Sequence, residues 1–457
     1  MIVMKFGGTS VESAEAIERV AGIVSERLSE QPVVVVSAMG KTTDRLLALA
    51  ATAVAGNRKL AIDLLRDLRD FHGNEARRLV PPANRVAVET HLDEHFQEIS
   101  ELIKGLSVLG ELTPRGIDAI SSYGERLSSL VVSQAFEHRG LPVTLVDSRK
   151  VIVTDNRHTL AAPLYEQSGK RLRECIPPLL AGGRVPVMGG FIAATESGVT
   201  TTLGRGGSDF TASIVGAALD AKRIEIWTDV DGLLTADPRL FRGARRVKVI
   251  SFDEASELAY FGARVLHPST LLPAVQKQIP VSILNSRKPD VPGTVIVAKT
   301  PAAKNTFKSI ACKKNITIVD ICSTRMLMAH GFLRAIFEVF DRFQTPVDMV
   351  TTSEVSVSLT IDNTRFLPEV VEELSRIASV SHESGKAIVC LVGDNIRHTP
   401  GIAGKVFKAV EKVNVRMISQ GASVINISFV VDEAHLKEVV SRLHRTFFRD
   451  LDPRVFD

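Results

Sequence analysis

The sequence predicts an α/β fold with a mostly parallel sheet between helix layers, followed by two small α+β modules. Short runs rich in Val and Ile alternate with helical stretches from residue 1 to about 297. A polar, proline-containing segment without periodicity follows at 299–307, and beyond it a helix and an alternating strand occur twice. Continuous apolar strands that alternate with helices are typical of a parallel sheet covered on both faces.

The predicted strands are uninterrupted apolar runs such as PVVVVS, and they lie at 2–6, 32–37, 142–146, 185–188, 224–227 and 281–284. The predicted helices repeat apolar residues at helical spacing, as Ile17, Val20, Ala21, Val24 and Leu28 do. These helices lie at 14–28, 44–55, 60–68, 86–103, 116–136, 208–219 and 252–261. A sheet of this kind binds ligands at the carboxyl ends of its strands.

The second half of the chain contains an internal repeat at an offset of 70 residues. Phe332, Ile336, Phe337 and Phe340 match Ile402, Val406, Phe407 and Val410 on one face of a predicted helix. The strand at 355–362 likewise matches the strand at 425–432. Two units are too few for a solenoid, so we expect two packed modules. The expected domains are 1–297, 306–385 and 386–457.

Composition argues against several classes of function. The 457 residues are 45% hydrophobic and 24% charged, and the net charge of +4 forms no basic stripe or tail, so we expect no nucleic-acid partner. No apolar run reaches bilayer length, so we expect no membrane partner. Four distant cysteines suit reduced thiols, and no histidine pair has metal-ligand spacing. We expect a cytoplasmic protein without a structural metal.

A two-glycine turn follows the first predicted strand. Lys5 and Phe6 end that strand, and Gly7 and Gly8 lead toward the first helix. Glycines let the backbone approach an anion, a helix N-terminus offers free N–H groups, and the lysine adds a positive charge. The Walker spacing is absent, so the segment indicates either a different phosphate-binding turn or simply a tight turn.

A second glycine-rich segment, GRGGSD at 204–209, leads into the helix predicted at 208–219. Arg205 could bind a carboxylate or a phosphate, and Ser208 and Asp209 stand at the helix start. Asp209 could merely cap that helix. Acids follow at Asp229, Asp231 and Asp237, where Asp-Gly and Asp-Pro are also ordinary turn dipeptides. Two anion-binding turns at one end of a parallel sheet favour phosphoryl transfer.

Six segments together resemble the aspartate kinases of the amino-acid kinase family. They are KFGGTS (5–10), YGER (123–126), GRGGSD (204–209), WTDVDG (227–232), ADPR (236–239) and FGARVLHP (261–268). The tandem modules after residue 306 resemble the ACT domains of the monofunctional, lysine-sensitive type. The resemblance implies transfer of the γ-phosphoryl of ATP, with Mg²⁺, to the β-carboxylate of L-aspartate. This reaction is the entry step to lysine, threonine and methionine.

The resemblance also implies roles for individual residues. Lys5 and Asp209 would be catalytic. The aspartate would be held by Thr43, Glu125, Arg205, Gly206, Gly207 and Ser208. ATP would be held by Lys5, Phe6, Gly7, Gly8, Thr228, Asp229, Leu234, Arg239 and Arg264. A carboxylate is already ionised at neutral pH, so its attack needs no general base and catalysis can rest on positioning and charge neutralisation.

Two positions depart from the family pattern in the nucleotide-binding segments. Arg264 stands where the family often has lysine, and Leu234 stands where many members have tyrosine. Arginine keeps the charge with a different reach, and leucine removes a polar or stacking contact. We expect both to affect nucleotide affinity more than the identity of the reaction.

The ACT modules imply feedback by an amino acid. The effector segment would comprise Met326, Ala329, Phe332, Leu333, Val347, Asp348, Ser353 and Glu354. Lysine is the expected effector, and threonine is the alternative. Phe332 and Leu333 could equally be module core. By resemblance we expect a homodimer or a dimer of dimers through these modules.

Three other functions compete with this interpretation. Another amino-acid kinase is disfavoured by the ACT pair and the SYGER segment. A catalytically silent amino-acid sensor is supported only by Arg264 and Leu234, and Glu125 could then be a solvated charge on its helix. An appended homoserine dehydrogenase is not expected, because the chain ends soon after the second module and no GxGxxG follows a strand.

Overall fold

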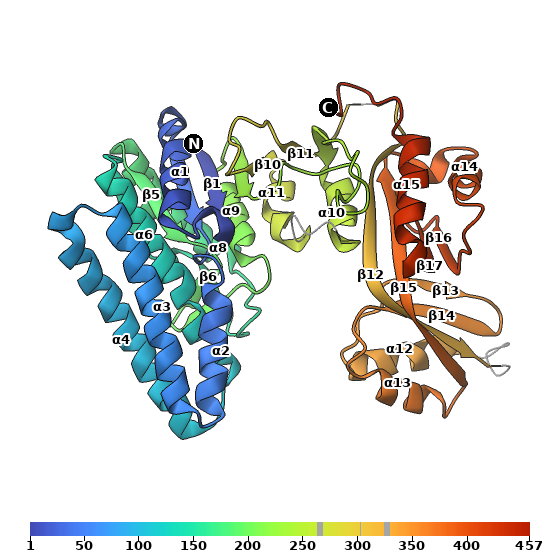
Figure 1. Ribbon diagram of the computed structural model, residues 1–457, viewed down its shortest axis with the longest axis horizontal. Helices are drawn as coiled ribbons and strands as arrows, with labels where there is room; N and C mark the ends of the chain where they lie inside the picture. The colour runs from blue at the N-terminus through green and yellow to red at the C-terminus, as the bar shows by residue number, and fades with distance from the viewer. Residues whose placement is uncertain (263–267, 302, 324–329) are drawn as a thin grey trace. The chain divides into compact units, whose positions relative to one another are not determined.

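The computed structural model describes residues 1–262, 268–301, 303–323 and 330–457. It divides into two compact units (Figure 1). Unit 1 comprises Met1–Gly232 and Leu266–Lys299, and unit 2 comprises Leu233–Val265 and Thr300–Asp457. The predicted α/β class is confirmed, and the break between Lys299 and Thr300 falls in the polar segment that we predicted as a boundary.

Unit 1 is built on a mostly parallel sheet with strand order β3-β5-β2-β1-β8-β10-β11. The strands are β1 (Ile2–Phe6), β2 (Pro32–Val36), β3 (Val143–Val146), β5 (Val185–Gly189), β8 (Ile224–Thr228), β10 (Val281–Asn285) and β11 (Thr294–Val297). Only β11 pairs antiparallel, with β10, among the pairings within these strands. Every residue of β1, β2 and β5 is buried, as expected for strands covered on both faces.

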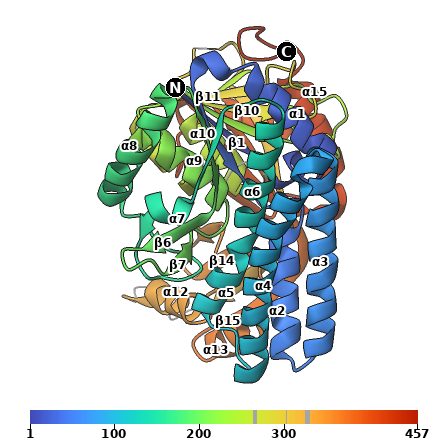
Figure 2. The same cartoon turned by 90° about the vertical axis from the view of Figure 1, so that its left-hand side faces the viewer.

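Helices cover both faces of this sheet. They are α1 (Ala14–Ser25), α2 (Thr42–Val54), α3 (Arg58–Leu79), α4 (Arg85–Leu109), α5 (Pro114–Ser121), α6 (Tyr123–His138), α7 (Ser148–Val151), α8 (Tyr165–Ala181), α9 (Gly207–Ala218) and α11 (Leu272–Gln276). Figure 2 shows α8 and α9 on one side of β1 and α6 on the other. In both views α2, α3 and α4 lie side by side as a bundle (Figures 1 and 2). The helix predicted at 116–136 is divided at Ser122 into α5 and α6.

A small second sheet consists of β4 (Val153–Thr154), which precedes β5 in the chain, and of β6 (Ile192–Thr195) and β7 (Thr200–Thr202), which follow it. At the core of the main sheet, the indole of Trp227 is fully buried and stacks on Phe6 with ring centroids 5.9 Å apart. Trp227 thus packs in the core near the carboxyl end of β8.

Unit 2 contains one six-stranded antiparallel sheet with strand order β13-β14-β12-β15-β17-β16. Its elements are β9 (Val249–Ser251), α10 (Phe252–Tyr260), β12 (Phe307–Cys322), α12 (Phe332–Arg342), β13 (Val350–Thr352), β14 (Ser356–Ile361), α13 (Leu367–Leu374), β15 (Ser379–Gly393), α14 (Ile402–Ala409), β16 (Met417–Gln420), β17 (Asn426–Asp432) and α15 (Leu436–Phe447). The two predicted repeats correspond to α12 with β14 and to α14 with β17.

The segment Leu233–Val265 belongs to unit 2, which the sequence pattern did not indicate. Its contacts with the start of β12 explain why. The Ser309 hydroxyl donates to the carbonyl oxygen of Leu234 at 2.6 Å, and Lys308 forms a buried ion pair with Glu254 at 2.9 Å. No helix among the described residues has the length and apolar character needed to span a bilayer. The four cysteines are free, and Cys322 is exposed.

Candidate active site

All the predicted catalytic and aspartate-binding residues of unit 1 except Arg205 converge on one cavity of about 280 Å³. It is lined by Lys5, Thr43, Glu125, Gly206, Gly207, Ser208 and Asp209, together with Ser37, Phe191 and Gly204. Lys5 comes from β1, Ser37 directly follows β2, and Ser208 and Asp209 lie in the first turn of α9. The cavity therefore lies at the carboxyl ends of the parallel strands, as predicted.

Lys5 and Asp209 form an ion pair inside this cavity. Lys5 Nζ lies 2.7 Å from Asp209 Oδ1, and the two side chains are only 10% and 11% exposed. The N-cap of α9 is Gly206, in the left-handed region at φ 71°, so Asp209 does not cap the helix. Its carboxylate instead fixes the position of the Lys5 ammonium group. A cation held in this way can neutralise negative charge that develops on a bound substrate.

The N-terminus of α9 points its first turn at the cavity, since Gly206, Gly207 and Ser208 all line it. Free N–H groups of a helix start favour an anionic ligand. The turn is positioned by close packing on Gly190, because a Cβ at Gly190 would lie 2.6 Å from the Cα of Ser208. Only glycine at position 190 allows this approach.

Glu125 is a buried carboxylate that faces the same cavity. The backbone N–H of Ala38 donates to its Oε1 at 3.1 Å, whereas its Oε2 has no hydrogen-bond partner among the described residues. Burial raises the pKa of Glu125 to about 8, although the Ala38 N–H and the charge of Lys5 act in the opposite direction. The alternative of a solvated surface charge is wrong, because the residue is only 4% exposed. A buried acceptor without a partner suits a ligand ammonium group.

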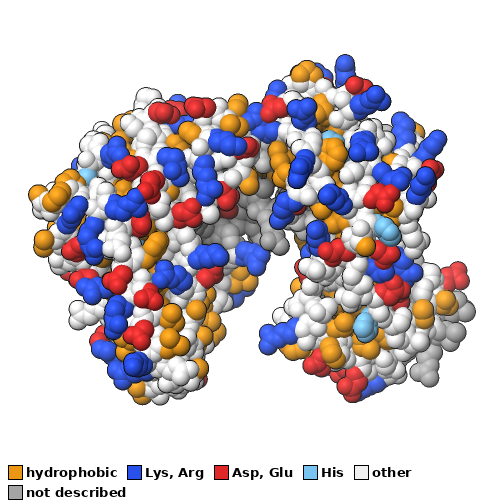
Figure 3. Space-filling model, in the orientation of Figure 1, with side chains coloured by type: hydrophobic (Ala, Val, Ile, Leu, Met, Phe, Trp, Pro, Cys, Tyr) orange, Lys and Arg blue, Asp and Glu red, His pale blue; other side chains and the backbone are white. Residues whose placement is uncertain are grey.

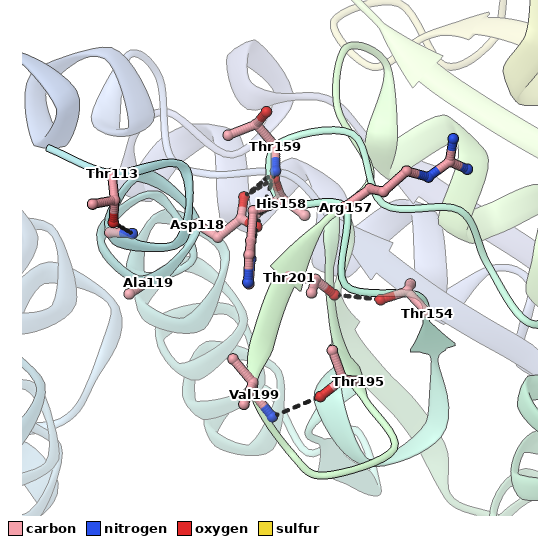
Figure 4. Close-up of polar contacts among 12 residues, drawn as sticks. Thr113, Asp118, Ala119, Thr154, Arg157, His158, Thr159, Thr195, Val199 and Thr201 are labelled. Atoms are coloured by element: carbon pink, nitrogen blue, oxygen red, sulfur yellow. Dashed lines mark hydrogen bonds and ion pairs between the residues drawn. The ribbon is translucent and has the colours of Figure 1, made fainter.

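A hydrogen-bond network behind the glycine turn holds one wall of the cavity. The Asp118 carboxylate accepts from the Thr202 hydroxyl at 2.5 Å and lies 2.7 Å from His158 Nδ1. Figure 4 shows Asp118 pointing toward His158 and Thr159 from α5. The loop that carries these residues lies against Gly204, where a Cβ would come within 2.7 Å of Leu160 Cδ1.

The predicted nucleotide-binding turns of unit 1 follow neighbouring strands. Phe6 pairs with Trp227 across β1 and β8, so Gly7–Gly8 and Thr228–Asp229 emerge at the same end of the sheet. A Cβ at Gly8 would lie 2.9 Å from the carbonyl oxygen of Ala38, which requires glycine there. The Thr228 side chain is half-buried, and the Asp229 side chain is exposed.

Besides the residues of these two turns, four more predicted substrate- or ATP-binding residues are not among those that line the cavity. Arg205 lies between two lining glycines but is exposed. Leu234 and Arg239 belong to unit 2, where Arg239 pairs with Asp237 at 2.7 Å. Arg264 lies outside the described residues.

The acidic side chains near the cavity bear on whether the site could hold Mg²⁺. Among the described residues, no group of three or more His, Cys, Asp or Glu lies close enough together to hold an ion. Mg²⁺ in phosphoryl-transfer enzymes is usually held by one or two carboxylates, waters and substrate phosphates. Two carboxylates stand at this end of the sheet: Asp209, which is paired with Lys5, and Asp229, which directly follows β8 and is exposed.

The predicted effector residues lie in unit 2. Asp348 has a side chain only 3% exposed, which pairs with Lys313 Nζ at 2.6 Å and accepts from the Tyr260 hydroxyl at 3.4 Å. Its Oδ2 has no hydrogen-bond partner among the described residues, and burial raises the pKa of Asp348.

The other effector positions differ in their surroundings. Phe332 and Val347 pack against a core cluster of unit 2, while Leu333 is 41% exposed on α12. Ser353 and Glu354 lie in the exposed turn between β13 and β14. Met326 and Ala329 lie outside the described residues.

Three lining residues escaped prediction, and two of them had a usable signal. Ser37 directly follows an apolar strand, where the strand-end rule places ligands. Phe191 follows a Gly-Gly pair and has φ 62°, and its N–H donates to the Thr211 hydroxyl at 3.0 Å. Gly204 was within a motif that we quoted, but nothing in the sequence distinguished its role from that of Gly206.

Comparison with known proteins identifies the family. The amino acid kinase family model matches residues 1–285, and an ACT domain model matches residues 389–447. The chain is 38% identical to lysine-sensitive aspartokinase 3 of Escherichia coli, over 98% of this chain and 99% of the relative. The chain belongs to the aspartokinases of the amino acid kinase family. It is thus an ATP-dependent kinase that acts on aspartate.

Other relatives agree with this assignment of the aspartokinase. Chloroplastic aspartokinase 1 of Arabidopsis thaliana is 40% identical over 98% of this chain and 80% of the relative. The structure of E. coli aspartokinase III with lysine and aspartate, in the T-state, matches with a TM-score of 0.85 at 35% identity, covering 98% of this chain and 100% of that one. The aspartate kinase of Clostridium acetobutylicum matches with a TM-score of 0.83 at 27% identity, with the same coverage.

Proposed function

We propose that this aspartokinase phosphorylates the β-carboxylate of L-aspartate in the cavity around Lys5, and that free lysine inhibits it through unit 2. The observation that carries the catalytic proposal is the convergence of the Lys5–Asp209 ion pair and the unpartnered Oε2 of Glu125 on one cavity. These groups provide a cation for a carboxylate or phosphate and an anion for an ammonium group, which an amino-acid substrate requires.

In the proposed reaction, an oxygen of the β-carboxylate attacks the γ-phosphorus of ATP. The bond between that phosphorus and the β,γ-bridging oxygen breaks, ADP leaves, and 4-phospho-L-aspartate forms. Lys5 stabilises the negative charge shared by the attacking and transferred groups, and Asp209 positions Lys5. No proton has to be removed from the nucleophile.

The substrate contacts follow from the lining of the cavity. Glu125 Oε2 accepts from the ammonium group of aspartate, and Arg205 with the α9 start binds its α-carboxylate. The start of α9 is formed by Gly206, Gly207 and Ser208, and Thr43 completes the pocket.

For ATP, we propose contacts from the turns after β1 and β8, formed by Phe6, Gly7, Gly8, Thr228 and Asp229. Leu234, Arg239 and Arg264 are proposed contacts by family resemblance alone. The E. coli enzyme of known structure was described with aspartate and ADP, which supports nucleotide use by this family. Mg²⁺ bound to the phosphates would neutralise their charge, and the carboxylates of Asp209 and Asp229 are the proposed protein partners.

For the effector, we propose L-lysine, with its ammonium group bound by Asp348 Oδ2, the buried acceptor without a partner. The E. coli relative is named lysine-sensitive and was described with lysine bound, which supports this choice. The remaining proposed contacts are Met326, Ala329, Phe332, Leu333, Val347, Ser353 and Glu354.

We also propose a homodimer or dimer of dimers, and the domain division 1–297, 306–385 and 386–457. The family matches at 1–285 and 389–447 support the first and last of these domains. Cytoplasmic location is a further proposal, with the plastid as the alternative that the names of the plant relatives suggest. Sedimentation tests the oligomeric state, and cell fractionation tests the location.

The deciding experiment measures acyl phosphate formation from L-aspartate, ATP and Mg²⁺, trapped as the hydroxamate, with and without lysine or threonine. We expect product that decreases on adding lysine. Asp348→Asn should keep the activity and lose the inhibition, whereas the exposed control Asp341→Asn should keep both. Inhibition by threonine alone would overturn the choice of effector, and absence of product would overturn the catalytic proposal.

A further inference from the structure

Unit 2 contains a second cavity, of about 760 Å³, that none of the predicted site residues lines. It lies between the loop that carries Phe241, Gly243 and Arg245 and the end of α15 with the residues after it. This volume falls within the range typical of small-molecule sites, about 300–1,000 Å³.

Three stacked rings form an aromatic part of the wall. The rings of Phe241 and His444 lie 4.1 Å apart at 30°, and those of His444 and Phe448 lie 4.8 Å apart at 22°. Gly243 allows this arrangement, because a Cβ there would lie 2.8 Å from the Phe241 ring. Such a stack offers flat apolar surface to a planar ligand.

His444 takes part in this stack as a neutral ring. Its Nε2 lies 2.8 Å from the hydroxyl of Thr235, and burial lowers the pKa of His444 to about 4, with the charge of Arg245 acting in the same direction. The positive charge of the cavity therefore comes from arginine.

Three guanidinium groups, from Arg245, Arg445 and Arg449, line the cavity. Among the residues that the structure describes, none of the three has a carboxylate within ion-pair distance. The one acidic side chain in the lining, Asp457, is bound by Arg246 at 2.6 Å and by Lys248 at 3.6 Å. Figure 3 shows Lys and Arg side chains gathered over the part of unit 2 where Figure 1 draws α14 and α15.

The charged and aromatic groups of the lining lie at the C-terminal end of α15 and directly after it, because α15 ends at Phe447. His444 and Arg445 lie in the last turn of α15, and Phe448 and Arg449 follow it, so two arginines and two stacked rings line the same cavity. Guanidinium groups bind phosphate oxygens in a bidentate manner, and aromatic faces bind nucleobases. The lining therefore offers partners for both the phosphates and the base of a nucleotide.

We propose that this cavity binds a nucleoside phosphate, with its base against the Phe241–His444–Phe448 stack and its phosphates on Arg245, Arg445 and Arg449. None of these residues is among those proposed to hold ATP for catalysis. The site is therefore an additional nucleotide site in the regulatory unit, and it does not depend on the assignment of the catalytic residues.

Equilibrium dialysis with ADP tests the proposal by counting bound nucleotide per chain. We expect two ADP for the wild type, and one for Arg445→Gln/Arg449→Gln, because the second site weakens by about 100-fold. The KM for ATP should stay unchanged in that variant. The control Lys412→Gln/Lys437→Gln removes two exposed charges of unit 2 outside the cavity and should retain two ADP.

A second variant separates recognition of the base from recognition of phosphate. Phe241→Leu removes one ring and should weaken the binding of ADP at the second site. The affinity of that site for inorganic triphosphate, measured by competition, should stay the same. Equal ADP binding by the wild type and the double arginine variant would overturn the proposal. If the second site bound inorganic triphosphate as tightly as ADP, and if Phe241→Leu left its affinity for ADP unchanged, the site would not recognise a base and the proposal of a nucleotide site would be overturned.

Discussion

The backbone N–H of Thr159 donates to both carboxylate oxygens of Asp118, each at 3.0 Å, and Thr159 is held at φ 70°. A residue with a branched side chain rarely adopts this left-handed conformation, which costs about 1–3 kcal/mol. The carbonyl oxygen of Thr159 lies 3.2 Å from where a Cβ of Gly204 would be. Asp118 is therefore a positioning residue that fixes the loop behind the glycine turn of the active site.

Asp118→Asn should raise the KM for aspartate by about tenfold, because the amide retains only one of the two acceptors for a charge-assisted hydrogen bond. The kcat should change by less than KM. Thr159→Gly in the same background should recover part of the loss, since glycine adopts φ 70° without strain. Steady-state kinetics check this, and a variant whose kcat falls while KM stays constant would contradict a positioning role.

Lys5→Met should lower kcat by at least about 1,000-fold, because it removes the cation that faces the reacting groups. Lys277→Met, which removes an exposed lysine paired with Asp220, is the matched control and should behave as the wild type. Binding of aspartate measured by dialysis should persist in Lys5→Met. Activity within tenfold of the wild type would remove Lys5 from the catalytic role.

Aspartate binding should depend on pH through Glu125. Its pKa of about 8 means that the free enzyme carries a proton there at neutral pH, which must leave when an ammonium group binds. The KM for aspartate should therefore fall as the pH rises from 6 toward 8, by up to about tenfold per unit. Glu125→Gln should raise KM and abolish this slope. A slope that survives in Glu125→Gln would assign the proton to another group.

His72 should make unit 1 less stable in acid. It is fully buried, Nδ1 lies 2.9 Å from the carbonyl oxygen of Leu68, and desolvation lowers its pKa from 6.5 to about 4. A base with a lowered pKa is protonated first in the unfolded chain, so its contribution is complete above pH 6.5 and is lost as the pH falls toward 4. The slope is at most about 1.4 kcal/mol per pH unit.

Urea unfolding at pH 7 and pH 5 checks this. His72→Gln should narrow the difference between the two midpoints, and His382→Gln, at an exposed histidine, should leave it unchanged. Equal differences in all three proteins would show that His72 does not control the acid response.

Breaking the buried pair Lys308–Glu254 should strongly destabilise unit 2. Its side chains are 1% and 2% exposed, so Lys308→Met leaves an uncompensated buried carboxylate and should cost about 3–5 kcal/mol. Lys308→Met/Glu254→Gln should recover most of this loss, because glutamine still accepts from the N–H of Ser251.

Chemical denaturation measures both variants. The exposed pair Arg376–Glu372 provides the control, and Arg376→Met should change the free energy of unfolding by less than about 1 kcal/mol. If Lys308→Met also lowered the free energy of unfolding by less than about 1 kcal/mol, water would have to reach the Lys308–Glu254 pair.

The sequence predicted the six parallel strands of the main sheet of unit 1 to within one residue, because strands buried on both faces are uninterrupted apolar runs. The antiparallel strand β11 was not predicted. β1 was predicted at its observed bounds, and the chemistry of Lys5 and Asp209 was found through glycine motifs and family resemblance. The burial of Glu125 was missed. It depends on close packing of α6 on β2 and α2, where a Cβ at Gly124 would lie 2.9 Å from both Ala38 Cβ and Thr43 Oγ1.

Two other features could not be predicted from the local sequence pattern, because they also depend on contacts between residues far apart in the chain. The assignment of Leu233–Val265 to unit 2 depends on single contacts such as Lys308–Glu254, whose partners are far apart in the chain. The Asp118 network likewise joins α5 to a loop with no periodicity. Helical spacing predicts which face of an element is buried, but it does not identify the partner of a buried polar group.

The long strands of unit 2 have a practical consequence. β12 pairs with β15 along nearly its whole length, with β14 on the outer side of β12 and β17 on the outer side of β15. The two repeats therefore share one continuous sheet. A cut between residues 385 and 386 would divide β15 and leave strands with unpaired backbone N–H and C=O groups at the sheet edges. A fragment carrying a single repeat should aggregate, so gene truncations that aim to isolate an effector module must keep both.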